Sequence, residues 1–100
     1  MKPVVVTLCG STKFKDEFID VNASETMAGK IVLSVGGFDH AEGVTLTDSQ
    51  RKMLAKLHEH KIDMSNEILV INVGGYIGES TRHEIEYARQ RGKKIRFFEQ

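Results

Sequence analysis

The chain has 100 residues, with 14 Lys plus Arg against 14 Asp plus Glu, so its formal net charge is zero. This length predicts one domain spanning residues 1–100, and 40% hydrophobic residues argue against wholesale disorder. The balanced charge argues against a nucleic-acid coat or a polybasic membrane anchor, so we expect neither a nucleic acid nor a membrane as partner.

Cysteine and histidine usage points to a reducing compartment and to no metal. Cys9 is the single cysteine, which excludes an internal disulfide. His58 and His60 are two residues apart, so they do not share a helical face and cannot form a close ligand pair. No segment approaches the roughly 18 apolar residues of a membrane span, and the first residues lead into a strand-like run without a signal peptide. We expect a cytoplasmic protein without a cofactor.

The first half of the chain alternates a strand, a helix and a second strand. Residues 4–8 are a buried-strand candidate, and residues 31–35 are another. Between them the pattern predicts a helix over about 13–27, with Ser11 or Thr12 as its N-cap. Three residues at helical spacing offer it an apolar stripe: Phe14, Phe18 and Val21.

The least regular part, residues 36–47, follows the end of the second strand. We therefore expect it on the same rim of the sheet as the loops 9–12 and 74–81. Thr47 followed by Gln50 is a capping-box signature, which predicts a helix running to about residue 65. Its apolar contribution is expected from Met53, Leu54, Leu57 and Met64.

The second half supplies the most apolar strand, residues 68–73, then a glycine loop, a helix ending near Gly92 and a last strand over 95–98. The order β-α-β-α-β-α-β with right-handed crossovers predicts a three-layer α/β sandwich on a parallel sheet. We expect strand order 2-1-3-4, which places the switch point between the first and third strands, where ligands bind in open α/β sheets.

Two loops at that point carry candidate binding residues. In Gly10-Ser11-Thr12, the glycine lets backbone approach a phosphate, while the hydroxyls and helix N–H groups can hold its oxygens. A plain capped turn explains the same residues equally well. Lys13 is a possible charge partner of a bound anion.

The second loop leads from Gly78 into Ser80, Thr81 and Glu84. With Thr81 as N-cap, Glu84 takes the N3 position of a capping box, which needs no function. A carboxylate in the first helical turn is also expected to stay ionised at neutral pH. Beside a phosphate-holding loop, such a carboxylate could attack a sugar anomeric carbon, as in retaining glycosyl transfer.

Cys9-Gly10-Ser11 after the first strand, and Ser80-Thr81-x-x-Glu84-Ile85-x-Tyr87-Ala88 after a late strand, resemble the nucleoside 2-deoxyribosyltransferase family. They are also similar to its relatives that hydrolyse the N-glycosidic bond of deoxynucleoside 5′-monophosphates. The resemblance implies a flavodoxin-like fold, Glu84 as the catalytic nucleophile, and sites completed by a neighbouring chain. It also implies that Gly10 and Ser11 line the sugar or phosphate pocket, with Ser80 and Thr81 as the family's small hydroxyl residues.

Other side chains have open roles. Asp63 and Glu59 both lie near the position of a family aspartate that precedes the third strand, so Asp63 is a further catalytic candidate. His40 could protonate a leaving base. Tyr76 could stack on a base or pack against a neighbouring element, and Arg82 is a possible anion partner.

Three functions compete. The first is an enzyme that cleaves or transfers at the N-glycosidic bond of a nucleoside or nucleoside 5′-monophosphate. The second is a non-catalytic nucleotide-binding or sensing module that uses the same loops. The third is a phosphoribohydrolase of the lonely-guy type, to which Gly74-Gly75-Tyr76 with a later Glu is similar. The small core and the apolar residues expected at the surface also predict a homodimer.

Overall fold

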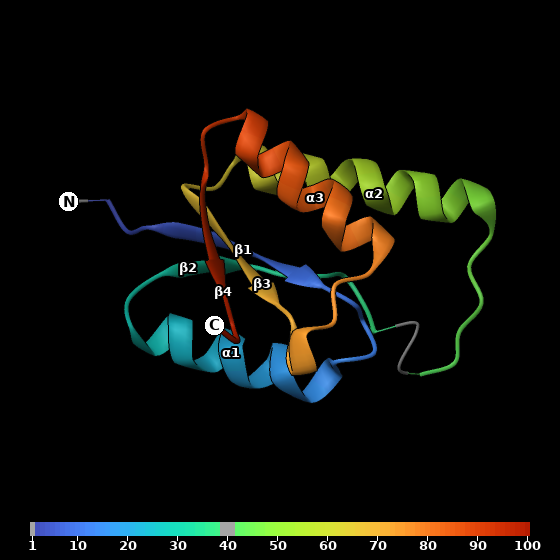
Figure 1. The fold of residues 1–100 in the computed structure, drawn as a ribbon, viewed down its shortest axis with the longest axis horizontal. Helices are drawn as coiled ribbons and strands as arrows, with labels where there is room; N and C mark the ends of the chain where they lie inside the picture. Colours follow the sequence, from blue (N-terminus) through green and yellow to red (C-terminus); the bar gives the residue numbers. More distant parts are fainter. Residues whose placement is uncertain (1, 39–41) are drawn as a thin grey trace.

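A parallel sheet forms the centre of the molecule. The computed structural model describes residues 2–38 and 42–100, and Figure 1 shows the chain alternating between the sheet and its helices. The strands are β1 (Val5–Gly10), β2 (Ile31–Leu33), β3 (Glu67–Ile71) and β4 (Lys94–Phe97). All neighbouring strands pair in parallel in the order β2-β1-β3-β4. The predicted α/β class and strand order are confirmed.

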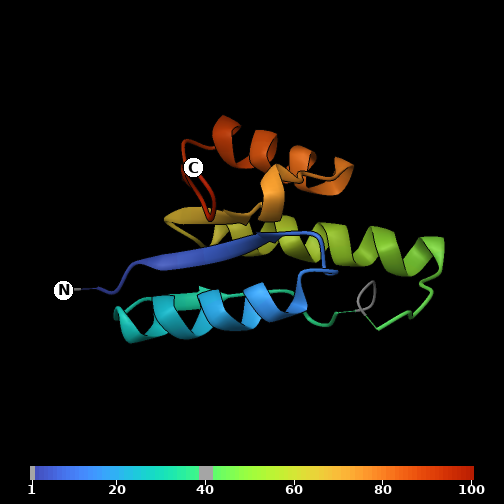
Figure 2. The same cartoon turned by 60° about the horizontal axis from the view of Figure 1, so that its bottom comes forward.

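Helices cover both faces of this sheet, which gives a three-layer, flavodoxin-like sandwich. Helix α1 (Lys15–Met27) lies on one face, while α2 (Asp48–Asp63) and α3 (Glu79–Gln90) lie on the other, as Figures 1 and 2 both show. A short 3₁₀ turn, η1 (Val73–Gly75), separates β3 from α3. Within residues 2–38 and 42–100, no helix is long and apolar enough to cross a membrane.

Strand alternation divides the core into two apolar clusters, one on each face of the sheet. Val6, Leu8, Leu69 and Ile71 pack with Phe18 and Val21 of α1. Cys9, Ile68 and Val70 point to the other face and pack with Ile62 of α2 and Ala88 of α3. All five residues of β3 are buried, which confirms a strand buried on both faces. The same alternation places Cys9 on the face covered by α2 and α3.

Helix starts agree with the prediction at α2 and differ at α1 and α3. Thr47 caps α2, and its hydroxyl and the Gln50 side chain form the predicted capping box. The N-cap of α1 is Phe14 rather than Ser11 or Thr12, without a side-chain cap bond. Here the Phe14 amide donates to the Ser11 carbonyl at 3.1 Å, so a backbone turn replaces the expected side-chain cap. The N-cap of α3 is Gly78 rather than Thr81.

The predicted apolar stripe of α2 is wrong for most of its members. Met53, Leu57 and Met64 are exposed, and the residues that α2 buries are His58 and Ile62. Figure 1 shows the first half of α2 running past the end of the sheet, on the right of the view. Met53 lies in this half of the helix and has no sheet beneath it, whereas Leu57 lies in the second half, next to the buried His58.

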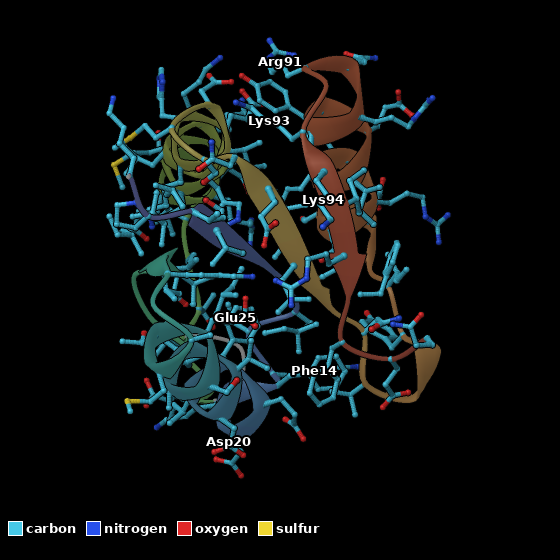
Figure 3. All side chains as sticks on the ribbon, turned by 90° about the vertical axis from the view of Figure 1, so that its left-hand side faces the viewer. Phe14, Asp20, Glu25, Arg91, Lys93 and Lys94 are labelled. Carbon is cyan, nitrogen blue, oxygen red and sulfur yellow. The ribbon has the colours of Figure 1, made fainter. Side chains whose placement is uncertain are left out.

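Charged residues close the opposite end of the sheet, where β3 begins. The Glu67 carboxylate contacts Arg96 at 2.8 Å and Lys30 at 3.2 Å, and Arg96 also binds Glu25 at 2.6 Å. In Figure 3, Glu25 lies on the side of α1 that faces the strands, whereas Asp20 points outward. These ion pairs tie α1 to β3 and β4 and leave the carboxyl ends of the strands for the loops.

Gly10, the last residue of β1, is closely packed at this carboxyl end of the sheet. A Cβ at Gly10 would lie 2.9 Å from the Ile71 carbonyl oxygen, and its φ of 152° is unfavourable for other residues. We expect Gly10→Ala to lower the free energy of unfolding by about 1–3 kcal/mol, the usual range for overpacking. Urea denaturation would measure the change. Gly36→Ala is the control, because Gly36 has open space around it; equal stability losses in both variants would contradict this account.

Candidate functional site

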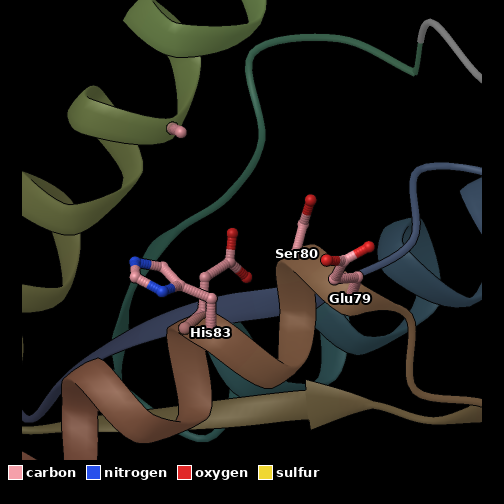
Figure 4. Close-up of a pocket in the computed structure, with 5 residues that line it drawn as sticks. Glu79, Ser80 and His83 are labelled. Carbon is pink, nitrogen blue, oxygen red and sulfur yellow. The ribbon is translucent and has the colours of Figure 1, made fainter.

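A cavity of about 920 Å³ opens at the carboxyl end of the sheet. Its walls come from the loops after β1, β2 and β3, from α2 and from the start of α3; they include Gly10–Thr12, Val35–Gly37, Val44–Leu46, Tyr76, Gly78–Thr81 and Glu84. A smaller hollow of about 350 Å³ lies between α2 and α3 and shares several of these residues with the cavity. Figure 4 shows Glu79, Ser80 and His83 around this hollow. For the described residues, the three loops lie on one rim as predicted.

A buried polar cluster lies where β1, α2 and α3 meet. Cys9 comes from β1, His58 from α2 and Glu84 from α3. The Cys9 Sγ atom is 3.4 Å from His58 Nε2, and this nitrogen is 3.8 Å from a Glu84 carboxylate oxygen. Cys9 is fully buried, His58 is 7% exposed and the Glu84 side chain is 17% exposed. Because His58 and Glu84 also line the cavity, the cluster forms part of its wall.

Burial sets the protonation of all three groups. It raises the pKa of Glu84 to about 7, although the Cys9 thiol and the nearby His83 act in the opposite direction. Burial together with the charge of Lys61 lowers the pKa of His58 to about 4, against a hydrogen bond with the Leu8 backbone. Burial and the nearby Glu84 raise the pKa of Cys9 well above its ordinary value. At neutral pH the cluster therefore holds a neutral imidazole and a thiol beside a partly protonated carboxyl group.

This environment overturns two expectations for Glu84. Because α3 begins at Glu79 with Gly78 as N-cap, Glu84 lies in the second turn and cannot be the N3 residue of a capping box. The expectation of a carboxylate kept ionised by the first helical turn is also wrong, since desolvation dominates and raises its pKa to about 7. Thr81, the expected cap, is instead a buried residue of the first turn.

Most of the predicted binding residues meet at the cavity. Its lining includes Gly10, Ser11, Thr12, Tyr76, Gly78, Ser80 and Thr81. The Tyr76 ring is half exposed and contacts Phe14 edge to face, with 5.9 Å between the ring centroids. The Lys13 ammonium lies 3.6 Å from the centre of the Tyr76 ring, so it places a positive charge beside the cavity.

Other predicted residues lie elsewhere. Asp63 accepts hydrogen bonds from the Tyr87 hydroxyl and pairs with Arg91 at 3.2 Å, away from the cavity lining. These contacts join α2 to α3, and the catalytic role expected of Asp63 stays a prediction. Arg82 is exposed and is not among the lining residues. His40 lies outside the described residues, so its role stays a prediction.

Sequence reasoning missed Cys9 and His58 as members of the site. The sequence does carry one usable signal, because His58 stands four residues before the buried Ile62 and so shares its helical face. When His58 is compared only with His60, the helical face that His58 shares with Ile62 goes unnoticed. The closeness of Cys9 and His58 follows from tertiary structure, since 49 positions separate them.

Comparison of the chain with protein-family models, with curated proteins and with solved structures finds no match.

The raised pKa of Glu84 predicts how stability varies with pH. Because the folded-state pKa of about 7 lies above the ordinary 4.5, protonated Glu84 stabilises the fold fully below pH 4.5. This contribution is lost as pH rises towards 7 and above. The neutral side chain in Glu84→Gln should therefore raise the free energy of unfolding relative to wild type at pH 8, by up to about 3 kcal/mol.

Urea denaturation at pH 8 and at pH 4.5 would measure this effect. We expect the gain of the variant to shrink at the lower pH, where wild-type Glu84 is itself protonated. Glu79→Gln is the matched control, because Glu79 is an exposed glutamate of the same helix. A Glu84→Gln protein less stable than wild type at pH 8 would contradict the assignment.

Proposed function

We propose that the protein cleaves or transfers at the N-glycosidic bond of a nucleoside or nucleoside 5′-monophosphate, with Glu84 as nucleophile. The observation that carries the proposal is the position of Glu84. Its carboxyl group lines a cavity whose walls also contain Gly10–Thr12 and Gly78–Thr81, the two loops suited to a phosphate or sugar. The proposal also draws on the resemblance of these motifs to the nucleoside 2-deoxyribosyltransferase family.

The chemistry proposed for Glu84 is a double displacement. An ionised carboxylate oxygen attacks the anomeric carbon, the bond from that carbon to the base nitrogen breaks, and the base leaves with the electron pair. A glycosyl ester of Glu84 results. Water then releases the sugar, or a second base accepts it. Partial exposure of the Glu84 side chain, at 17%, allows an oxygen to reach a bound sugar while most of the group stays shielded from water.

The binding part of the proposal rests on backbone and charge. The first N–H groups of α3 have no partners within the helix, and together with the helix dipole they favour an anion near Gly78. Ser80 and Thr81 stand in this first turn, and Ser11 lies across the same cavity. Tyr76, half exposed at the cavity, offers a ring face of the kind on which a base can stack.

Glu84→Gln provides the test of catalysis. The amide keeps the shape of the side chain but cannot form the glycosyl ester, so base release should fall by at least about 1,000-fold, as expected on removal of a nucleophile. Chromatographic assay of free base from a panel of ribo- and deoxyribonucleosides and their 5′-monophosphates would measure it. Glu79→Gln, at the same cavity, should keep most activity.

Wild-type turnover by Glu84→Gln would overturn the nucleophile assignment. A wild-type protein that binds nucleoside monophosphates but releases no base from any of them would favour the non-catalytic binding module. A strong preference for ribonucleotides would favour the phosphoribohydrolase alternative over a deoxyribosyl-specific enzyme.

We further propose that a second copy of the chain covers the exposed apolar part of α2. Val44, Met53 and Leu57 are about half exposed and line the cavity. The first half of α2 also extends past the sheet (Figure 1). Exposed apolar clusters of this kind are typical of protein interfaces. A partner seated on them would exclude water from the cavity, which favours the proposed chemistry.

Sedimentation velocity tests the dimer. Wild-type protein should sediment as a dimer, and Leu57→Asp should shift it to a monomer, because a carboxylate in an apolar interface is costly. Lys56→Asp changes charge at the neighbouring exposed position, where the side chain is 71% exposed, and should leave the dimer intact. A monomeric wild-type protein at high concentration would contradict the proposal.

A further inference from the structure

Three donor atoms of the kinds that zinc prefers meet beside the cavity. They are Cys9 Sγ, His58 Nε2 and a Glu84 carboxylate oxygen, all within 4.8 Å of one another. Sulfur, imidazole nitrogen and carboxylate oxygen are the usual protein ligands of Zn²⁺. We propose that Cys9, His58 and Glu84 bind a Zn²⁺ ion with its fourth coordination position open to the cavity.

The spacing of the donors is close to that of a formed site. A tetrahedral Zn²⁺ with one sulfur, one nitrogen and one oxygen ligand separates its donor atoms by about 3.3–3.6 Å. Here sulfur and nitrogen are 3.4 Å apart, and nitrogen and oxygen are 3.8 Å apart. Sulfur and oxygen lie within 4.8 Å of each other. The donors also come from three different elements, which hold them in place without the metal.

The imidazole of His58 is oriented as a ligand. Its Nε2 atom faces both Cys9 and Glu84. Histidine ligands usually donate their other N–H to a backbone carbonyl or a carboxylate, which fixes the ring and leaves one nitrogen for the metal. Against the effect of burial, the Leu8 backbone acts to raise the pKa of His58, as a backbone acceptor beside the ring would.

Access to the cluster is from the cavity. Cys9 is fully buried, and the less buried His58 and Glu84 line the cavity wall, so a metal ion reaches the thiol past Glu84. Binding replaces the thiol proton, and the Glu84 proton where that carboxyl group is protonated, and releases these protons to solvent. With three protein ligands, the fourth position is left for water or for a ligand in the cavity, as in open zinc sites.

Zinc at this place has a consequence for the proposed glycosidic chemistry. A Glu84 oxygen that coordinates Zn²⁺ cannot at the same time attack an anomeric carbon, so the metal-bound protein should be inactive as a glycosidase. Metal binding itself does not rest on the proposed function, because it needs only the three donors. Direct binding measurements therefore keep the two proposals distinguishable.

Titration of chelator-treated, reduced protein with Zn²⁺ in a calorimeter tests the site. We expect one equivalent to bind. Co²⁺ in place of Zn²⁺ should give the near-ultraviolet thiolate charge-transfer band and the intense visible bands of a tetrahedral site. Second-shell changes alone weaken metal sites by about 10–100-fold, so loss of a ligand in Cys9→Ser or His58→Ala should weaken binding by more than about 100-fold.

His60→Ala is the matched control for His58→Ala, since His60 is an exposed histidine on the same helix, and it should bind as wild type does. Circular dichroism establishes that each variant folds. If Cys9→Ser or His58→Ala does not fold, the Co²⁺–thiolate band of the wild-type protein decides, because Cys9 is the single cysteine. Absence of that band, or binding that survives both ligand substitutions, would overturn the proposal.

Discussion

The polar cluster of Cys9, His58 and Glu84 is the constraint on which the site depends. It stands where β1, α2 and α3 meet, a position that apolar side chains usually fill in a layered α/β domain. Burying such groups is costly unless they contact one another, and here Cys9 is 3.4 Å from His58, which is 3.8 Å from Glu84. Because the three side chains come from three elements, the cluster links α2 and α3 to β1 beside the apolar contacts of Ile62 and Ala88.

The same burial gives the cluster its chemical properties. Desolvation raises the pKa of Glu84 to about 7 and lowers that of His58 to about 4, so at neutral pH the imidazole is uncharged and the carboxyl group is partly protonated. A carboxyl group held in this way is a candidate for function, because environments that shift a pKa so far gather at active sites. The proposed nucleophile and the proposed zinc ligand are two uses of one group. Each needs the ionised oxygen, so they exclude each other.

The fold could be predicted from sequence because its signals are local. Short apolar runs gave the strands, and capping and glycine signals gave most of the loops. Thr47 and Thr81 show the limit of such signals, since both begin a Thr-x-x-Glu/Gln pattern. Thr47 is exposed and caps α2, whereas Thr81 is buried inside the first turn of α3. Packing decides whether such a threonine is the N-cap or lies within the first turn of the helix, and the sequence pattern carries no information about packing.

The loops that line the cavity were predictable because the carboxyl ends of parallel strands meet at one edge of the sheet. The polar cluster beside these loops was not predictable. Cys9 and His58 lie 49 positions apart, and they meet because alternation along β1 turns Cys9 towards α2. The exposure of Met53 was equally hidden, since it depends on α2 being longer than the sheet that it covers. Local periodicity predicts which face of a helix is apolar, but it does not predict where the sheet beneath that helix ends.

Trapping of the glycosyl–enzyme ester tests the central claim most directly. Fluorine at C2 of the sugar destabilises the positively charged transition state and slows release of a covalent intermediate. After incubation with a 2-fluoro-2-deoxynucleoside 5′-monophosphate, intact-mass spectrometry should show the addition of one sugar phosphate, which peptide mapping places on Glu84. Release of base without this adduct, or an adduct on another residue, would contradict the assignment of Glu84 as the nucleophile.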